Sequence, residues 1–491
     1  MSQDLAVSET PAPPASARSG ARTRWRFVSI AVAVFVALAG VRAITGQPML
    51  TSAGTIQATL AFAVPIGLAG LGGLWAERAG IINIGLEGMM VLGTWFGAYF
   101  AWSFDNPWVG LVAGVLGGMA GGLIHAVATV TFGVDHIVSG VAINILAVGA
   151  MRYLSLLFFV GAPGGGAAQS PQLPEFPEVG LPFVAEVLAP ARDSGIFLVS
   201  DTASLVTGLT TNMSVMTLLA VLLVPLTFAV LWHTPFGLRL RSCGENPDAA
   251  ESLGVPVYTY KFTAVVLSGG FAGMGGVFLA MVASSVYQEG QTGGRGYIGL
   301  AAMIFGNWRP GGLAMGAGLF GFTDALQVRG GGGAVHSLLL LIAAALLVTA
   351  AGMLAATLRR MRSTPSFARM AALWGVFAVG TALAAAGGTA AATGGPAWWW
   401  AVAALGAAAG AFAAVRAVGS WPDAGGRLPL AALVAAPTGA VVLVVYFATD
   451  SLPGQLVTYS PHIATLLVLA LASQRLRPPA SVGRQWRKGR A

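Results

Sequence analysis

Near the middle of the chain, two long apolar segments flank the polar run HTPFGLRLRSCGENPDAAESLGVPVYTYK, residues 233–261. Within this run Asn246 can cap a short helix, Pro247 suits the first helical position, and Gly254 can end the helix. A helix of about two turns is too short to be stable alone in water. We therefore expect something outside the run to hold this helix in place.

The composition around this run is that of a membrane protein. Of the 491 residues, 56% are hydrophobic and only 9% are charged, and the apolar residues come in runs of about twenty, the length needed to cross a bilayer. The basic residues are nearly all arginines at the ends of these runs, which indicates membrane topology and not nucleic-acid binding. The single cysteine, Cys243, excludes an internal disulfide. We expect its thiol to be exposed to solvent.

The apolar runs predict an all-α fold, a polytopic membrane helix bundle. With the N-terminus placed in the cytoplasm, 21 of the 26 basic residues fall in the inner segments, so both termini and the 233–261 run are expected to be cytoplasmic. The candidate spans are 26–45, 53–75, 83–103, 108–131, 136–160, 213–232, 260–285, a short one at 297–307, 311–328, 337–357, 370–390, 398–417, 429–449 and 459–473.

The one long outer segment, 161–212, begins with Pro, Gly and Ser residues and is acidic. It carries five carboxylates against Arg192: Glu175, Glu178, Glu186, Asp193 and Asp201. Two interpretations stay open at this point. The segment is either a solvated linker or a docking surface for an external partner.

A weak internal repeat relates IGLEGMMVLGTW (84–95) to IGLAAMIFGNW (298–308). The two copies run in opposite directions in the predicted topology, and inverted repeats bracket a central pathway in many transporters. Chance similarity between two Gly- and Leu-rich segments is the alternative. Glycines at small-xxx-small spacing predict close helix packing; they are Gly114, Gly118, Gly122, Gly269 and Gly273.

The stretch LWAERAGIINIGLEGMM (74–90) holds charged groups at the edge of the apolar zone. Glu77 and Arg78 can pair with each other, whereas Asn83 and Glu87, four residues apart, are expected on one helix face. A carboxylate at that depth either faces a pathway or accepts hydrogen bonds that fix helix packing. The polar residues that are candidates for these two roles are Asn83, Glu87, Ser139, Asn144, Asp324 and Gln327.

Motifs for enzyme chemistry are missing from the sequence. It contains no GxxxxGK[ST], HExxH, CxxC or GxSxG pattern, and its five histidines are scattered. The chain is therefore predicted to bind no metal or cofactor, to have no catalytic residues and to lack its own ATPase site. A membrane-embedded enzyme is disfavoured, while an ion-coupled secondary transporter stays open as an alternative.

Several segments, in this order, resemble the permease subunits of bacterial ABC importers, in the branched-chain amino acid and ribose permease superfamily. The similarity is greatest to its simple-sugar and nucleoside branch. The segments are LWAERAGIINIGLEGMM from Leu74, DHIVSGVAINILA from Asp135, TPFGLRLRSCGENPDAAESLGVPVYTYKF from Thr234, LSGGFAGMGGVFLA from Leu267, and TGGRGYIGLAAMIFGNWRPGG from Thr292.

The resemblance implies a set of partners and a mechanism. Two permease subunits, identical or homologous, would form a pathway in the lipid of the bacterial plasma membrane. Cytoplasmic ATPase subunits would use ATP, and an extracytoplasmic solute-binding lipoprotein would deliver a nucleoside or, second, a simple sugar for import by alternating access. The resemblance assigns an ATPase-coupling loop to Gly237, Arg239, Arg241, Gly244, Glu245, Asn246, Pro247, Ala250 and Gly254.

The predicted organisation departs from that family in one place. Residues 1–24 are expected to be disordered and cytoplasmic, and 25–332 to form the permease core. An inserted unit of about four helices, 333–451, then precedes the last core helix, 452–475, and a basic cytoplasmic tail, 476–491.

The alternative function, an ion-coupled secondary transporter, predicts uptake that survives ATP depletion but collapses with the ion gradient.

Overall fold

The computed structural model describes residues 16–361, 367–392, 396, 402–403, 405–407, 410, 427–452, 454–457, 459–460, 463 and 476–487. The chain divides into two compact units. The larger unit comprises 52–193, 202–335 and 452–491, and the smaller unit comprises 1–51, 194–201 and 336–451.

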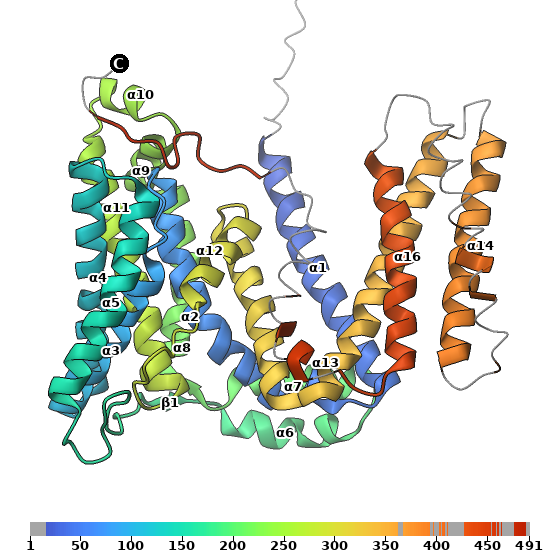
Figure 1. Ribbon diagram of the computed structural model, residues 1–491, viewed down its shortest axis with the longest axis horizontal. Coiled ribbons are helices and arrows are strands. Elements are labelled where there is room, and N and C mark those ends of the chain that lie inside the picture. Colours follow the sequence, from blue (N-terminus) through green and yellow to red (C-terminus); the bar gives the residue numbers. More distant parts are fainter. Residues whose placement is uncertain are drawn as a thin grey trace, which may run out of the picture. The chain divides into compact units, whose positions relative to one another are not determined.

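Long helices form the larger unit, as the apolar runs predicted (Figure 1). Among the described residues of both units, six helices are long and apolar enough to cross a membrane. The protein is therefore a multi-pass membrane protein. The helices of the larger unit are α2 (Ala53–Arg78), α3 (Leu86–Phe104), α4 (Pro107–Ala126), α5 (His136–Phe158), α8 (Val215–His233), α11 (Val257–Phe278), α12 (Arg295–Phe305) and the first part of α13 (Pro310–Met361).

Short polar side chains mark where these helices begin. The Ser52 hydroxyl accepts a hydrogen bond from the Thr55 amide at 3.2 Å, and the Asp135 carboxylate accepts one from the Ile137 amide at 2.8 Å. Such caps satisfy the amides that a helix leaves unpaired in its first turn. One π-helical turn extends α4 (Val127–Thr131) and another extends α11 (Leu279–Ala283).

Helices α3, α4 and α11 pack through glycines at backbone contact, as their spacing predicted. A Cβ added to Gly118 would lie 2.6 Å from the Gly273 Cα, and one added to Gly273 would lie 2.9 Å from the Gly118 Cα. Small residues allow membrane helices to approach closely and gain dispersion energy along their length. These three helices form the rigid centre of the larger unit.

The two ends of the larger unit differ in structure. One end, called the α10 end below, carries α9 (Pro235–Glu245), α10 (Pro247–Ser252) and residues 476–487 (Figure 1, top left). The opposite end carries β1 (Glu178–Val179), paired antiparallel with β2 (Met213–Ser214), and α6 (Pro182–Asp193). Part of α7 (Val199–Thr210) also belongs to this unit. The acidic 161–212 segment is therefore partly helical, which its Pro- and Gly-rich start did not predict.

The smaller unit is also helical. It contains α1 (Ser16–Thr45), the 3-10 turn Pro48–Leu50, the part of α13 after a non-helical residue at Gly331, α14 (Phe367–Ala392) and α16 (Arg427–Ala448). Helix α1 begins inside the 1–24 segment that the sequence predicted to be disordered. The candidate span 398–417 and most of the predicted last core helix, 452–475, lie outside the described residues.

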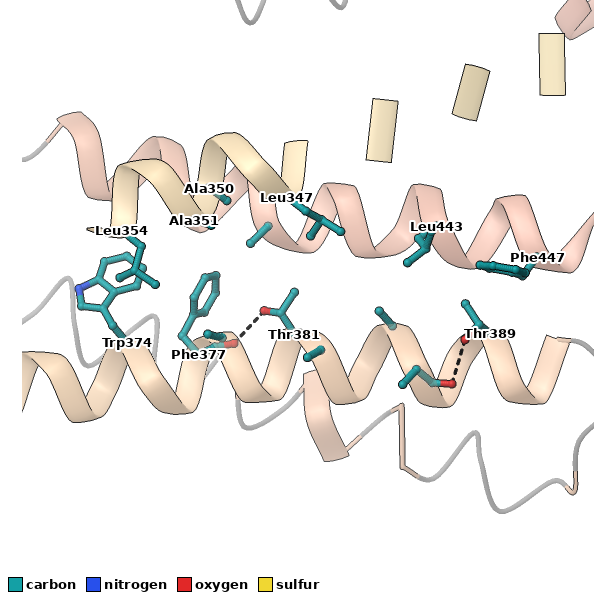
Figure 2. A pocket seen from close by; sticks show the side chains of 15 residues that line it. Leu347, Ala350, Ala351, Leu354, Trp374, Phe377, Thr381, Thr389, Leu443 and Phe447 are labelled. Atoms are coloured by element: carbon teal, nitrogen blue, oxygen red, sulfur yellow. Dashed lines mark hydrogen bonds between the residues drawn. The ribbon is translucent and has the colours of Figure 1, made fainter. Parts of the chain in front are cut away.

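An apolar pocket of about 430 Å³ lies between α13, α14 and α16 in the smaller unit. Figure 2 shows Trp374 and Phe377 toward one end of this pocket and Phe447 toward the other. The hydroxyl of Thr381 donates to the Phe377 carbonyl at 2.8 Å, and that of Thr389 donates to the Ala386 carbonyl at 3.0 Å. Both hydroxyl protons are thus used within α14, and the lining suits an apolar group better than a polar solute.

Candidate functional site

A break in the helical backbone separates α2 from α3. Residues 79–85 are non-helical, and Gly80 has a φ of +91°. The Ile82 amide donates to His136 Nδ1 at 3.4 Å, and the Ile82 carbonyl lies 3.0 Å from His125 Nε2. Since a carbonyl only accepts, His125 Nε2 donates. Irregular backbone inside a membrane protein must be paired internally, and these two histidines provide the partners.

Two of the predicted polar residues support this break. The Ser139 hydroxyl lies 2.9 Å from His125 Nδ1, so it fixes the orientation of the ring that pairs with Ile82. Asn83 is fully buried and donates to the Ser268 hydroxyl at 2.9 Å. Because α3 begins only at Leu86, Asn83 and Glu87 do not share a helix face, and that prediction was wrong. Asn83 instead joins the break to α11.

Glu87 joins the start of α3 to the start of α12. Its Oε1 accepts from the Gly294 amide at 2.8 Å, and its Oε2 accepts from the Gly296 amide at 2.7 Å. A carboxylate at a helix N-terminus satisfies unpaired amides and balances the positive end of the helix dipole. A Cβ on Gly296 would lie 2.6 Å from the Glu87 amide nitrogen, so the two N-termini are in direct contact.

Asn144 on α5 completes the junction of α3 and α12. Its Oδ1 accepts from the Gly88 amide at 2.7 Å, and its Nδ2 donates to the Ile84 carbonyl at 3.1 Å and the Tyr297 hydroxyl at 2.8 Å. The Tyr297 ring is 46% exposed. Asn83, Glu87, Ser139 and Asn144 are thus brought together, and we call them, with Tyr297, the helix-break cluster.

Two predicted pathway residues lie elsewhere. Asp324 and Gln327 are on the part of α13 that packs against the N-terminal half of α2. There a Cβ on Gly54 would meet the Arg329 guanidinium carbon at 2.9 Å. This separation could not be predicted from local patterns, because the register of α13 against α2 depends on glycines on both helices, such as Gly54 and Gly321.

Two residues at the start of α12, Arg295 and Tyr297, were not predicted as part of the candidate site. The Arg295 guanidinium lies 5.8 Å from the Phe62 ring centroid, a cation–π distance. Tyr297 follows it in the first turn of α12. The signal that could have revealed both is their position at the start of the short span 297–307, where a half-length helix leaves its N-terminus inside the bundle.

The charged residues at the end of α2 contact the turn after α12. The Trp308 indole donates to Glu77 at 2.6 Å, and the Arg78 guanidinium donates to the Trp308 carbonyl at 2.6 Å. Arg78 also lies 3.9 Å from the Glu245 carboxylate of α9. The predicted Glu77–Arg78 pair is therefore not formed. Successive side chains on a helix point about 100° apart, and each charge finds a partner on another element.

The predicted coupling loop contains two helices and not one. Asn246 Oδ1 accepts from the Ala249 amide at 3.0 Å, Pro247 is the first residue of α10, and Gly254 has a φ of +80°. The predicted cap and the glycine stop are thus present. Residues 235–245, treated as part of a polar loop, form α9, whose cap is the Thr234 hydroxyl.

The other coupling-loop residues fix α9 to the bundle. A Cβ on Gly244 would lie 3.0 Å from the Gly80 amide nitrogen, and one on Gly237 would clash with the backbone of α8. Arg241 donates to the Leu231 carbonyl at 2.9 Å. Pro247 and Ala250 form the buried face of α10, while Arg239 of α9 is exposed. The side chain of Leu253, which follows α10, is 84% exposed.

Cys243 is buried, so the predicted solvent-exposed thiol was wrong. Its side chain packs with Ala250, Val257 and the partly buried Trp486. Burial raises the pKa of the Cys243 thiol to about 11. The prediction failed because charged residues were taken to mark a loop, whereas they occupy the outer face of α9 and leave an inner face for Cys243.

Labelling of Cys243 with a maleimide should be slow and strongly dependent on pH. Only the thiolate reacts, so a pKa of about 11 predicts a rate that rises about tenfold for each pH unit between about pH 7 and about pH 9. The rate is measured on the intact protein by mass spectrometry. A rate that levels off near pH 9 would mean that the thiol has an ordinary pKa and is not held in this interface.

Known proteins are similar over the part of the chain that holds these features. The family model described as the branched-chain amino acid transport system permease component matches residues 55–351. The guanosine ABC transporter permease NupQ of Bacillus subtilis is 37% identical over 285 residues, 56% of this chain and 82% of that protein. The nucleoside ABC transporter permease NupC of Lactococcus lactis is 36% identical over 283 residues, 55% of this chain and 81% of that protein.

A third relative carries a sugar name. The putative glucose ABC transporter permease TsgC13 of Haloferax volcanii is 34% identical over 281 residues, 57% of this chain and 79% of that protein. The matched residues include the break after α2, α9, α10 and α12, while α14 and α16 lie beyond the family match. The family prediction is confirmed, and the chain belongs to the permease component family of branched-chain amino acid transport systems.

Proposed function

We propose that this chain is the membrane permease subunit of an ABC importer, driven by separate ATPase subunits. The observation that carries the proposal is the α10 end. A capped six-residue helix is seated on the bundle there, and Leu253 beside it is 84% exposed. An apolar side chain presented on a rigid support is typical of an anchor for a protein partner.

The contacts around α9 offer a route from such a partner to the helix-break cluster. Glu245 of α9 lies 3.9 Å from Arg78, and Arg78 donates to the Trp308 carbonyl after α12. At its other end α12 is held by Glu87 of α3. Movement of α10 would therefore displace α12 and, through Glu87, α3, which supports alternating access by a rigid-body shift of these elements.

A nucleoside is the first substrate proposal and a simple sugar the second. Two of the relatives described above are named for guanosine or nucleosides and one for glucose. The half-exposed Tyr297 suits stacking with a base, and the hydrogen bond from Asn144 Nδ2 to its hydroxyl holds the ring in place.

The remaining partners are proposed from the family and the surface. A second permease subunit would complete the pathway, with the exposed apolar side chains of α5, such as Ile145 and Leu146 (each 68% exposed), facing it or membrane lipid. A solute-binding lipoprotein would dock at the end that carries β1 and α6, where Glu175, Glu178 and Glu186 are exposed. This assigns the α10 end to the cytoplasm.

Changing Leu253 to aspartate should abolish coupling without unfolding the permease. The charged side chain stays in water in the free protein, but it cannot enter an apolar recess, so uptake of labelled nucleoside and recovery of the ATPase with the purified permease should fall by at least about tenfold. Leu253→Met, which keeps an apolar side chain of similar volume, is the control and should behave as the native protein.

Two results would contradict the proposal. Uptake at the native rate by Leu253→Asp would show that α10 is not where the ATPase binds. Uptake by the native protein that survives ATP depletion and stops when the ion gradient is collapsed would favour an ion-coupled secondary transporter instead.

A further inference from the structure

Residues 476–487, here called the strap, cross the α10 end of the larger unit and bond to three separate elements. The Arg477 amide donates to Asn307 Oδ1 at 2.8 Å, at the turn after α12. The Ser481 amide donates to the Gly244 carbonyl of α9 at 2.9 Å. The Gly483 amide donates to the Gly80 carbonyl in the helix break at 3.1 Å.

The strap also fixes α10 through Trp486. The Trp486 indole donates to the Asp248 carboxylate of α10 at 2.5 Å. Its ring lies 5.2 Å from the Tyr258 ring of α11, and the Lys261 ammonium lies 5.9 Å from its centroid. Trp486 therefore fills the space between α10 and α11, beside the buried Cys243.

We propose that the strap and α10 together form the docking surface for the ATPase, with the strap holding α10 in position. This inference rests on the function proposed above. A six-residue helix cannot persist by its own hydrogen bonds, and the strap supplies contacts to α10 that neither α9 nor α11 provides. By the same contacts the strap links α10 to Gly80, in the break before α3, and to Asn307, in the turn after α12.

The exposed groups of this composite surface define the partner chemistry. Arg484 and Arg487 of the strap and Arg239 of α9 are exposed, and so is Leu253, the residue after α10. The surface fits a protein with an apolar recess for Leu253 and carboxylates around its rim. Anionic lipid headgroups could pair with the arginines, but headgroups alone provide no apolar recess for Leu253.

The test compares Trp486→Ala with Gln485→Ala in the full-length permease, purified with its ATPase in lipid nanodiscs. Gln485 is the exposed neighbour of Trp486. In Trp486→Ala, maleimide labelling of Cys243 should be at least about tenfold faster, because the indole that packs beside the thiol is gone and α10 is no longer held over it. Recovery of the ATPase and uptake should each fall by about tenfold, while Gln485→Ala stays native in all three measurements.

Trp486→Phe keeps the protein testable if the alanine variant does not accumulate. The ring contacts stay and only the hydrogen bond to Asp248 is lost, so labelling and ATPase recovery should lie between those of native protein and Trp486→Ala. This graded order supports the proposal, because it separates the indole donor from ring packing.

Three outcomes would overturn the proposal. Native labelling of Cys243 in Trp486→Ala would show that the strap does not hold α10. Fast labelling with native ATPase recovery and uptake would show that the strap takes no part in docking. Loss of function in Arg484→Glu and Arg487→Glu that occurs only in anionic nanodiscs would assign these arginines to lipid. Failure of the proposed importer function would be visible earlier, as ATP-independent uptake by the native protein.

Discussion

Replacing Gly273 with leucine should prevent the larger unit from packing and cause a large loss of stability. A Cβ at Gly273 would lie 2.9 Å from the Gly118 Cα and would also clash with the Gly114 carbonyl. These obstacles are backbone atoms that cannot rotate away, so α11 and α4 must separate. We expect a loss of at least about 3 kcal/mol, the upper end for overpacked cores, measured by thermal unfolding in detergent.

Gly149→Leu is the matched control for this prediction. Gly149 lies on α5, where an added Cβ would meet no atom within 4 Å, so the same side chain should leave the unfolding temperature of the purified protein almost unchanged. Equal stability of the two variants would contradict the close approach of α4 and α11. A loss confined to Gly273→Leu would show that helix contact, and not leucine in a membrane helix, is the cause.

The helices could be predicted from the sequence because the bilayer fixes their length. The run 136–160 corresponds to α5 (His136–Phe158), and the short run 297–307 corresponds to α12 (Arg295–Phe305). Caps such as Asp135 then set the boundaries to within a few residues. The glycine spacing in α4 and α11 was equally informative, since small residues at every fourth position share one helix face.

The helix-break cluster could be predicted only in part. Glu87 and Asn144 were identified because polar groups are costly in an apolar span, but the break itself depends on distant partners. Ile82 bonds to His125 and His136, which are 43 and 54 residues away in the chain. No local pattern around Ile82 reveals those bonds, so the spacing of Asn83 and Glu87 was interpreted as helical.

The prediction that Cys243 is exposed to solvent was wrong for a related reason. The caps of α10 are local, and they were predicted from Asn246, Pro247 and Gly254. The burial of Cys243 is not local, because it requires Val257 of α11 and Trp486 of the strap to meet α9. Those residues are far apart in the sequence, and their approach is decided by tertiary packing.

Replacing Glu87 with alanine should separate the start of α3 from the start of α12 and strongly reduce transport. The carboxylate accepts from the Gly294 and Gly296 amides at 2.8 and 2.7 Å. Hydrogen bonds to a charged group contribute about 1.5 to 3 kcal/mol each, and the amides left unpaired carry a further cost inside the bundle. We expect a loss of about 3 kcal/mol or more in unfolding free energy and a fall in uptake of at least about tenfold.

The Glu87→Gln variant tests whether the contact between α3 and α12 needs the negative charge and both carboxylate oxygens. One glutamine oxygen can accept from Gly294 or Gly296, but its NH₂ group must face the other amide donor, so stability and uptake should lie between those of native protein and Glu87→Ala. Glu289→Gln is the control. Among the described residues, the Glu289 carboxylate forms one ion pair, with the exposed Arg152 guanidinium at 3.4 Å, and such a pair contributes at most about 1 kcal/mol.

If Glu87→Gln and Glu289→Gln unfolded at the same temperature, the Glu87 carboxylate would not be holding the start of α12. If Glu87→Ala kept native stability but lost uptake, Glu87 would contact solute in the pathway, the other role that a carboxylate at this depth can have.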